Sequence, residues 1–316
     1  MSDGSATGPS CWTGRMSIDL VTGAFGNTGA TIARLLHAEG RSVRTLTNHP
    51  PEPGDNDIDI DVRPLSFDDP TALHAALDGV ETFYNTFWMR TGDRTGHDTA
   101  VRRSRLLLEA ARRAGVRNIV QLSVVKPSAD SPYAYFRGKA AVEEAARATG
   151  LPVAVVRPAL IFGGDAVLLH DLAWILRRAP VLPIPGDGTY RVRPVHISDL
   201  AHLCVEAGTT SSEATVDAVG PERPTYEELV RDVRAAVGSR ARLVRMPAPL
   251  VLAGARALGL VVRDRLPTRE ELESTMDGLA DSDAPAIGDV SLHGWIHDHA
   301  DDLGRSRRGQ GPPATT

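Results

Sequence analysis

Three residues near the middle of the chain have the types and the spacing that proton transfer requires. Ser123 closes an apolar run, and Tyr135 and Lys139 follow it four residues apart in a segment with helical periodicity. Positions i and i+4 of a helix share a face, so the phenol and the ammonium should point the same way. We expect the lysine to lower the pKa of the phenol from about 10 towards neutrality. Such a tyrosine can act as an acid or a base, beside a serine hydroxyl that holds a carbonyl oxygen.

A glycine-rich turn near the start of the chain predicts a dinucleotide-binding site. An apolar run at residues 18–21 leads into Gly23, Gly26 and Gly29, and a helical pattern follows as far as Gly40. This strand–turn–helix arrangement places a pyrophosphate against a helix N-terminus, which offers free N–H groups and partial positive charge. Each motif alone also fits a structural turn or a pair of surface neighbours. Their occurrence together, in this order, favours an enzyme that binds a dinucleotide.

Strand-like and helical segments alternate through the first half of the chain. Repeated βα units of this length predict an α/β fold, a Rossmann-type doubly wound parallel sheet with a small C-terminal substrate lobe. The helical pattern at residues 98–114 carries Val101, Leu106 and Leu108 as core candidates. The expected strands are residues 18–21, 42–47, 80–86, 118–125 and 153–156, and the expected helices include residues 71–77, 98–114 and 135–149.

Beyond Pro158 the alternation of strand-like and helical segments becomes less regular. We expect helices at residues 167–177, after Asp199 and after the capping box at residues 225–228, and two more that open at Pro249 and Pro267. The expected divisions are a disordered extension (1–16), a dinucleotide-binding core (17–165), a smaller substrate lobe interleaved with that core (166–304) and a disordered tail (305–316).

Composition excludes several classes of function. The net charge of −5 over 316 residues provides no basic field for nucleic acid, and no apolar stretch is long enough for a membrane span. Cys11 and Cys204 form no disulfide framework, which predicts a reducing, cytoplasmic location. His196 and Asp199 lack a third ligand at suitable spacing, so we expect no metal, and Asp199 is expected to cap a helix.

These motifs together resemble the short-chain dehydrogenase/reductase superfamily, in its atypical and extended branches (NmrA-like and epimerase-like). The opening turn at residues 22–29 reads T-G-x-x-G-x-x-G, residues 157–163 are similar to the R-P-x-x-x-(Y/F)-G segment beside the nicotinamide, and residues 193–201 to a late strand–helix segment. The resemblance covers about residues 17–235. It implies a Rossmann fold, a nicotinamide cofactor, and Ser123, Tyr135 and Lys139 as the catalytic trio.

The same resemblance implies that Lys139 also holds the nicotinamide ribose, and that Phe67 lies beside the adenine. It makes the helices at residues 98–114 and 135–149 candidate dimer surfaces, so a monomer or a homodimer is expected. The turn and the resemblance together assign to the cofactor Gly23, Phe25, Gly26, Asn27, Thr28, Gly29, Thr47, Asn48, His49, Phe67, Thr86, Lys139, Pro158 and Leu160.

The end of the second strand bears on which nicotinamide cofactor is used. An acidic residue about 20 residues beyond the glycines would grip the ribose of NAD. Thr47, Asn48 and His49 stand there instead, and their side chains can hydrogen-bond a 2′-phosphate. This favours NADP(H), although related reductases carry an arginine where Asn48 stands. NAD(H) stays open, as does the alternative that these residues only form a turn before Pro50.

The end of the strand at residues 80–86 indicates the substrate. Phe87, Trp88 and Met89 follow it and suit a flat hydrophobic ligand, while Phe162 joins them through the resemblance. Phe87 fits core packing equally well. We therefore expect a reductase of a ketone or quinone on a hydrophobic, aromatic small molecule; a polyketide ketoreductase of secondary metabolism would be one form.

Two other functions stay open. A sugar-nucleotide epimerase or dehydratase shares the motifs, but such relatives place an arginine where this chain has Val192, between Arg191 and Arg193. A non-catalytic redox sensor that binds NAD(P) is the second alternative. Relatives of that kind usually lack the tyrosine found here at position 135.

Overall fold

The computed structural model describes residues 17–50, 57–89, 94–164, 167–210, 213–254 and 268–305. The expected extension at residues 1–16 and nearly all of the expected tail lie outside these ranges, as does Pro267. Among the described residues, no helix combines the length and the apolar character that crossing a bilayer requires.

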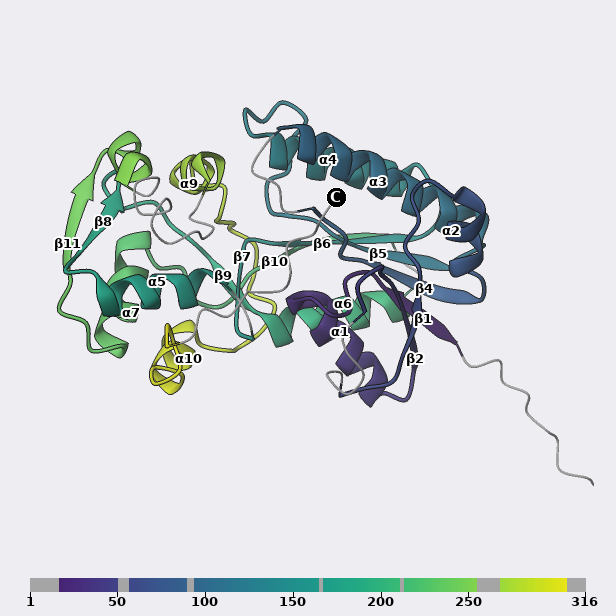
Figure 1. The fold of residues 1–316 in the computed structure, drawn as a ribbon, viewed down its shortest axis with the longest axis horizontal. Helices are drawn as coiled ribbons and strands as arrows, with labels where there is room; N and C mark the ends of the chain where they lie inside the picture. The colour runs from purple at the N-terminus through teal and green to yellow at the C-terminus, as the bar shows by residue number, and fades with distance from the viewer. Residues whose placement is uncertain are drawn as a thin grey trace, which may run out of the picture.

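Seven parallel strands form the central sheet, in the order β10-β6-β5-β4-β1-β2-β3 (Figure 1). The chain winds one way from β1 to β3 and the other way from β4 to β10, so the topological switch point lies between β1 and β4. This confirms the predicted Rossmann-type α/β fold. The strands are β1 (Ile18–Val21), β2 (Ser42–Leu46), β3 (Ile60–Arg63), β4 (Val80–Asn85), β5 (Asn118–Leu122), β6 (Val153–Pro158) and β10 (Ala214–Ala218).

Helices cover both faces of the sheet because successive strand residues point to opposite sides. Leu20 of β1 packs into the cluster under the upper helices, and its neighbour Val21 packs into the cluster over the lower ones. Figure 1 shows α2, α3 and α4 above the sheet and α1 and α6 below it. Their bounds are α1 (Asn27–Ala38), α2 (Pro70–Ala76), α3 (Arg94–Arg113), α4 (Ala134–Arg147) and α6 (Ile197–Thr209).

A separate hydrophobic cluster forms the lobe at the left of Figure 1. Two small parallel sheets, β7 with β9 and β8 with β11, accompany its helices. An unlabelled helix at residues 248–254 contains Pro249 in its first turn, as expected. The remaining elements are β7 (Leu160–Phe162), α5 (Val167–Arg178), β8 (Val181–Pro185), β9 (Pro194–His196), α7 (Tyr226–Ala236), β11 (Arg242–Met246), α9 (Arg269–Met276) and α10 (Leu292–Asp298).

The structure corrects two expectations about the helices. Leu106 is 37% exposed, whereas Leu107 is fully buried, because the buried stripe of α3 runs through Ala100, Ser104 and Leu107. Asp199 does not cap α6: the helix begins at Ile197, and the His196 ring accepts the hydrogen bond from the Ser198 N–H. By contrast, the capping box that opens α7 has both of its expected hydrogen bonds.

Candidate active site

The glycine turn lies at the switch point of the sheet and brings the first turn of α1 directly onto the end of β1. A Cβ on Gly29 would lie only 2.1 Å from the Gly23 carbonyl oxygen, and Gly23 itself has a φ of +67°. The Gly26 N–H donates to the Gly23 carbonyl at 2.8 Å. Gly26 also caps α1 without a side chain that could occupy its first N–H groups. The turn therefore fits a dinucleotide pyrophosphate, which needs close backbone approach and free N–H donors.

Two threonines tie this turn to the neighbouring strand. The Thr86 N–H donates to the Thr22 hydroxyl at 2.9 Å, and the Thr86 hydroxyl donates to the Thr22 carbonyl. On the other side of the turn, a Cβ on Gly164 would lie 2.7 Å from Asn27 Oδ1. Gly164 lies in the loop that follows β7, so this loop approaches the start of α1. Thr86 and Asn27, both predicted to bind the cofactor, thus lie beside the turn.

The residues after β2 form a hydrogen-bonded turn. The Asn48 amide donates to the Leu65 carbonyl at 2.7 Å, and its oxygen accepts from the Leu65 N–H at 2.9 Å. The Thr47 hydroxyl accepts from the His49 N–H at 3.1 Å. The Thr47–His49 contact corresponds to the turn that the sequence left as an alternative, whereas the Asn48 contacts join this segment to Leu65, which follows β3. A 2′-phosphate would have to compete with them for Thr47 and Asn48.

An aromatic group gathers around the predicted catalytic helix. The Trp88 ring packs over Gly138, where an added Cβ would lie 2.8 Å from Trp88 Cη2. Lys139 Nζ lies 4.6 Å from the Trp88 ring, and the Tyr135 ring meets it edge-on with centroids 5.5 Å apart. Trp88 is thereby in contact with both predicted catalytic side chains on α4. The small residue between Tyr135 and Lys139 is what allows this contact.

His97 belongs to the same group, although no sequence motif selects it. Its ring stacks against Trp88 at 5.9 Å and lies 6.1 Å from Tyr135. The His97 Nδ1 atom is buried and has no hydrogen-bond partner among the residues described. A buried nitrogen beside a phenol is a candidate contact for a polar substrate atom.

Electrostatics here differ from the expectation. Burial raises the pKa of Tyr135, and Glu271 acts in the same direction. Lys139 does not offset this: its Nζ lies 5.8 Å from the Tyr135 ring centroid and donates to the Leu122 carbonyl. The expected lowering of the Tyr135 pKa is therefore wrong. Its phenol keeps its proton at neutral pH and can serve as a proton donor.

Lys139 is a buried cation. Its side chain is 4% exposed, and burial lowers its pKa to about 8. Nζ donates to the Leu122 carbonyl at 3.2 Å, at the end of β5. The ammonium is thus partly neutralised near physiological pH and is held by one carbonyl and one aromatic face. A strongly perturbed group of this kind often marks a functional site.

Ser123 follows β5 and faces a different polar group from the one expected. Its hydroxyl is buried and makes no hydrogen bond of normal geometry, but it lies near enough to the Glu143 carboxylate to affect it. Burial raises the pKa of Glu143, but the hydrogen bonds from Arg157, together with the nearby Ser123 hydroxyl, outweigh that effect and lower the pKa. Arg157 grips the carboxylate at 2.9 and 2.6 Å. The Glu143–Arg157 pair thus lies next to Ser123. Glu143 follows Lys139 by four residues, a spacing that could have identified it.

The lobe reaches the catalytic helix through α9. Tyr133, the N-cap residue of α4, provides no side-chain cap, and the Glu270 carboxylate accepts from the Tyr135 N–H at 2.7 Å instead. A carboxylate at a helix N-terminus is favoured by the helix dipole. The Tyr133 hydroxyl donates to Asp277 at 2.5 Å. No pattern within the sequence indicates these contacts, because they join segments more than 130 residues apart.

The predicted substrate residues divide into two groups. Phe87 packs against the upper core and lies 5.5 Å from Phe67, and Arg103 contacts both the Phe67 ring (4.9 Å) and Met89 Sδ (3.3 Å). These residues lie near Trp88 at the end of β4. Phe162 is instead fully buried in the lobe core, where its ring meets Trp295 at 5.8 Å. The structure does not bring Phe162 to the Trp88 group.

Comparisons with known proteins agree with this geometry. Residues 23–168 match the NAD(P)H-binding family. The chain is 32% identical over 244 residues to the ceramide reductase of Caulobacter vibrioides. The aligned region covers 73% of this chain and 74% of that relative. The family model and this relative together show that the chain belongs to the NAD(P)H-binding family.

Solved structures show the same fold. A nucleoside-diphosphate-sugar epimerase from Staphylococcus aureus superposes with a TM-score of 0.71 at 16% identity, over 89% of this chain and 100% of that one. The triphenylmethane reductase of Citrobacter sp., solved with NADP(H), gives 0.70 at 18% identity, over 90% and 99%. Reductases and epimerases therefore share this architecture, and the two must be separated by their side chains.

Replacing Gly29 by alanine should block cofactor binding. The new Cβ would meet the Gly23 backbone at 2.1 Å, so α1 must move away from β1 and the N–H groups lose their alignment. We expect NADP(H) affinity to fall at least about tenfold, roughly 1.4 kcal/mol, in a calorimetric titration. Gly254→Ala is the matched control, because a Cβ there meets nothing within 4 Å. Equal affinity in the two variants would place the cofactor elsewhere.

Replacing Lys139 by methionine should stabilise the protein. The unfolded chain binds the lysine proton up to a pKa near 10.5 and the folded chain only up to about 8. This group therefore makes the free energy of unfolding rise between those pH values, and its buried charge costs stability below them. The Leu122 carbonyl keeps a hydrogen bond from Gln121 at 2.9 Å. We expect denaturant unfolding at pH 7 to show a gain of about 1–3 kcal/mol and a flatter profile above pH 8.

Lys126→Met provides the control for this measurement, because Lys126 is exposed and donates to the Gly278 carbonyl. That variant should keep the pH profile of the parent protein. A Lys139→Met protein that is less stable than the parent and has the same pH profile would show that burial of the Lys139 charge does not cost stability.

Proposed function

We propose that this protein is an NAD(P)H-dependent reductase of a ketone or quinone carbonyl on a hydrophobic, aromatic small molecule. The observation that carries the proposal is the contact of Trp88 with both Tyr135 and Lys139, at the edge of the sheet where the glycine turn lies. An aromatic face next to a protonated phenol suits a flat carbonyl compound whose oxygen accepts a proton.

The residues of the chain have separate tasks in this proposal. A bound nicotinamide cofactor supplies the hydride for the carbonyl carbon. The Tyr135 hydroxyl donates its proton to the developing alkoxide oxygen, and its raised pKa ensures that the proton is present at neutral pH. Lys139 would hold the nicotinamide ribose. Ser123 offers the substrate oxygen a second hydrogen bond from its buried hydroxyl.

The substrate class follows from the walls of the site. Trp88, Phe87 and Met89 supply apolar surface after β4, and Tyr135 and His97 continue it from the two covering helices. A ring stacked on this surface would lie with its carbonyl towards the polar edge at Tyr135 and His97. The ceramide reductase and the triphenylmethane reductase are named for apolar substrates, which is consistent with this class. A polyketide ketone is one member of it.

Sugar-nucleotide chemistry is the second candidate, favoured by the epimerase fold. The two arginines nearest to the expected diphosphate position are already engaged: Arg191 donates to the Arg223 carbonyl at 2.8 Å, and Arg193 donates to the Gly220 and Ser282 carbonyls at 3.1 and 2.8 Å. Val192 between them is buried. These contacts support reduction of an apolar carbonyl over binding of a sugar diphosphate.

Replacing Tyr135 by phenylalanine tests the proposal. Loss of the proton donor should lower turnover by at least ~10²-fold, measured as NADPH oxidation with a panel of aromatic ketones and quinones, while NADPH affinity stays within a few-fold. Tyr133→Phe is the control: its hydroxyl is committed to Asp277, so its effect on turnover should be small.

The same panel separates the alternatives. An unchanged rate for Tyr135→Phe would remove the phenol from the reaction and favour proton transfer from the substrate itself. Tight NADP(H) binding without turnover of any carbonyl would indicate a redox sensor. Interconversion of UDP-sugars without net oxidation of cofactor would indicate an epimerase.

NADP(H) should bind more tightly than NAD(H). No acidic side chain stands at residues 47–49 to repel the 2′-phosphate, and Thr47 and Asn48 can exchange their turn hydrogen bonds for contacts with it. Titration of both reduced cofactors under identical conditions measures the preference. Binding of NADH tenfold tighter than NADPH would refute it.

A further inference from the structure

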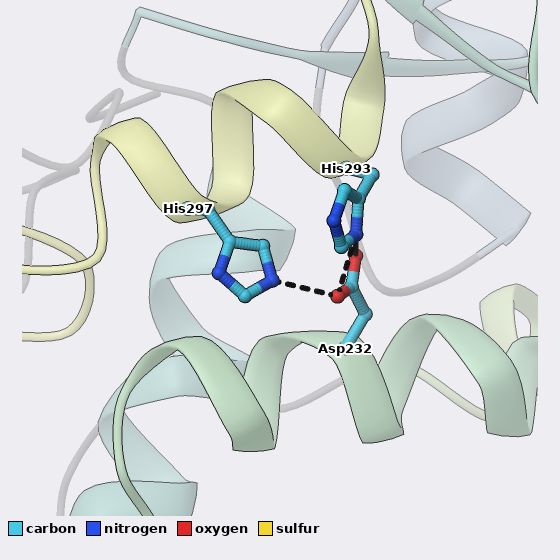
Figure 2. A group of neighbouring side chains, drawn as sticks. All are labelled: Asp232, His293 and His297. Atoms are coloured by element: carbon cyan, nitrogen blue, oxygen red, sulfur yellow. Dashed lines mark hydrogen bonds and ion pairs between the residues drawn. The ribbon is translucent and has the colours of Figure 1, made fainter.

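Two histidines and an aspartate on the lobe direct their ligand atoms at one another (Figure 2). His293 and His297 project from α10 four residues apart, and Asp232 faces them from α7. Asp232 Oδ1 lies 2.9 Å from His293 Nδ1 and 3.0 Å from His297 Nε2. Within the part of the chain that the structure describes, this is the group of potential metal ligands whose atoms all lie within 4.8 Å of one another.

We propose that Asp232, His293 and His297 bind a divalent transition-metal ion of the zinc class, which joins α10 to α7. Zinc binds imidazole nitrogen and carboxylate oxygen at about 2.0–2.2 Å, so adjacent ligand atoms of a tetrahedral ion lie about 3.3 Å apart. The observed separations of 2.9 and 3.0 Å need to open by only a few tenths of an ångström. Two imidazoles favour zinc, copper, nickel or cobalt over magnesium or calcium.

The framework behind the cluster is fixed before any ion binds. Leu292 and Ile296 on the opposite side of α10 are buried in the lobe core, at 3% and 0% exposure, so the histidines face outward. The Glu222 carboxylate accepts from the Ser291 hydroxyl at 2.5 Å and from the backbone N–H of His293 at 3.1 Å. These two hydrogen bonds anchor the start of α10. On α7, Val233 beside Asp232 is fully buried.

Solvent completes the coordination. The side chains of His293 and His297 are 66% and 41% exposed, whereas Asp232 is 23% exposed. Three protein ligands on a ridge leave at least one position for water, as in zinc sites with an open coordination position. The ion would lie on the outer side of the lobe. Its expected effect is therefore on the attachment of α10, whose Trp295 packs against Phe162 in the lobe core.

The competing explanation is that hydrogen bonds alone hold the cluster together. The two explanations require different protonation of the imidazole nitrogens. A metal-free cluster needs an N–H on each nitrogen that faces Asp232, whereas a metal needs a lone pair on both. His293→Asn and His297→Gln each keep an amide N–H near the place of the ring nitrogen and remove the metal ligand. These variants preserve the hydrogen-bonded connection between the helices, so they separate the two explanations.

The test is a Zn²⁺ titration of the full chain after treatment with a chelator. We expect one ion per chain, and a melting temperature that rises by about 2–4 °C when Zn²⁺ is about tenfold above its dissociation constant. His293→Asn, His297→Gln and Asp232→Asn should each weaken Zn²⁺ at least tenfold, since even the outer partners of metal ligands are worth about 10–100-fold. His202→Gln, an exposed histidine on α6, should leave binding unchanged.

NADPH binding by each variant reports whether its core is folded, independently of the metal. Three outcomes would overturn the proposal: no saturable Zn²⁺ binding, variants that bind as tightly as the parent protein, or a rise in melting temperature that Mg²⁺ reproduces. The second outcome would mean adventitious binding at other histidines. Loss of both binding and thermal shift in all three variants, with NADPH binding retained, supports the site.

Discussion

The arrangement of the candidate site depends on the buried ammonium group of Lys139. Lys139 is held by the carbonyl that ends β5 and by the Trp88 ring that follows β4, and that ring fits against α4 only because residue 138 is glycine. Burial makes the charged form of Lys139 unfavourable. A bound ligand that contacts the ammonium group would compensate for this cost. The switch point of the sheet, with its glycine turn, lies beside this group and provides such a ligand site.

The lobe contributes more than a cover for this edge. Glu270 of α9 accepts the hydrogen bond from the backbone N–H of Tyr135, two residues after the N-cap position of α4, and so supplies the cap that α4 lacks. The buried Glu143 carboxylate forms an ion pair with the partly exposed Arg157 near Ser123. The supporting contacts of the site thus come from three distant segments, while the proposed preference for a flat substrate rests on the apolar residues after β4.

The sequence predicted the features that depend on local geometry. The glycine spacing, the parallel βα order and the Tyr135–Lys139 helix all follow from short-range patterns, and the structure has each of them. It missed β3, whose Ile-Asp-Val-Arg sequence forms a half-exposed edge strand. The raised pKa of Tyr135, the burial of Phe162 and the cap from Glu270 depend on which segments meet in space. Neither the roles of the trio nor the identity of the substrate follows from the fold alone.

A crystal structure of the complex with NADP(H) tests the central claim most directly. The account predicts that the pyrophosphate lies on the N–H groups at the start of α1, with Lys139 Nζ in hydrogen-bond contact with the nicotinamide ribose. The Tyr135 hydroxyl should face the reactive carbon of the nicotinamide across a space bordered by Trp88. A cofactor whose nicotinamide lies away from Tyr135, with Trp88 still filling the space between them, would contradict the account.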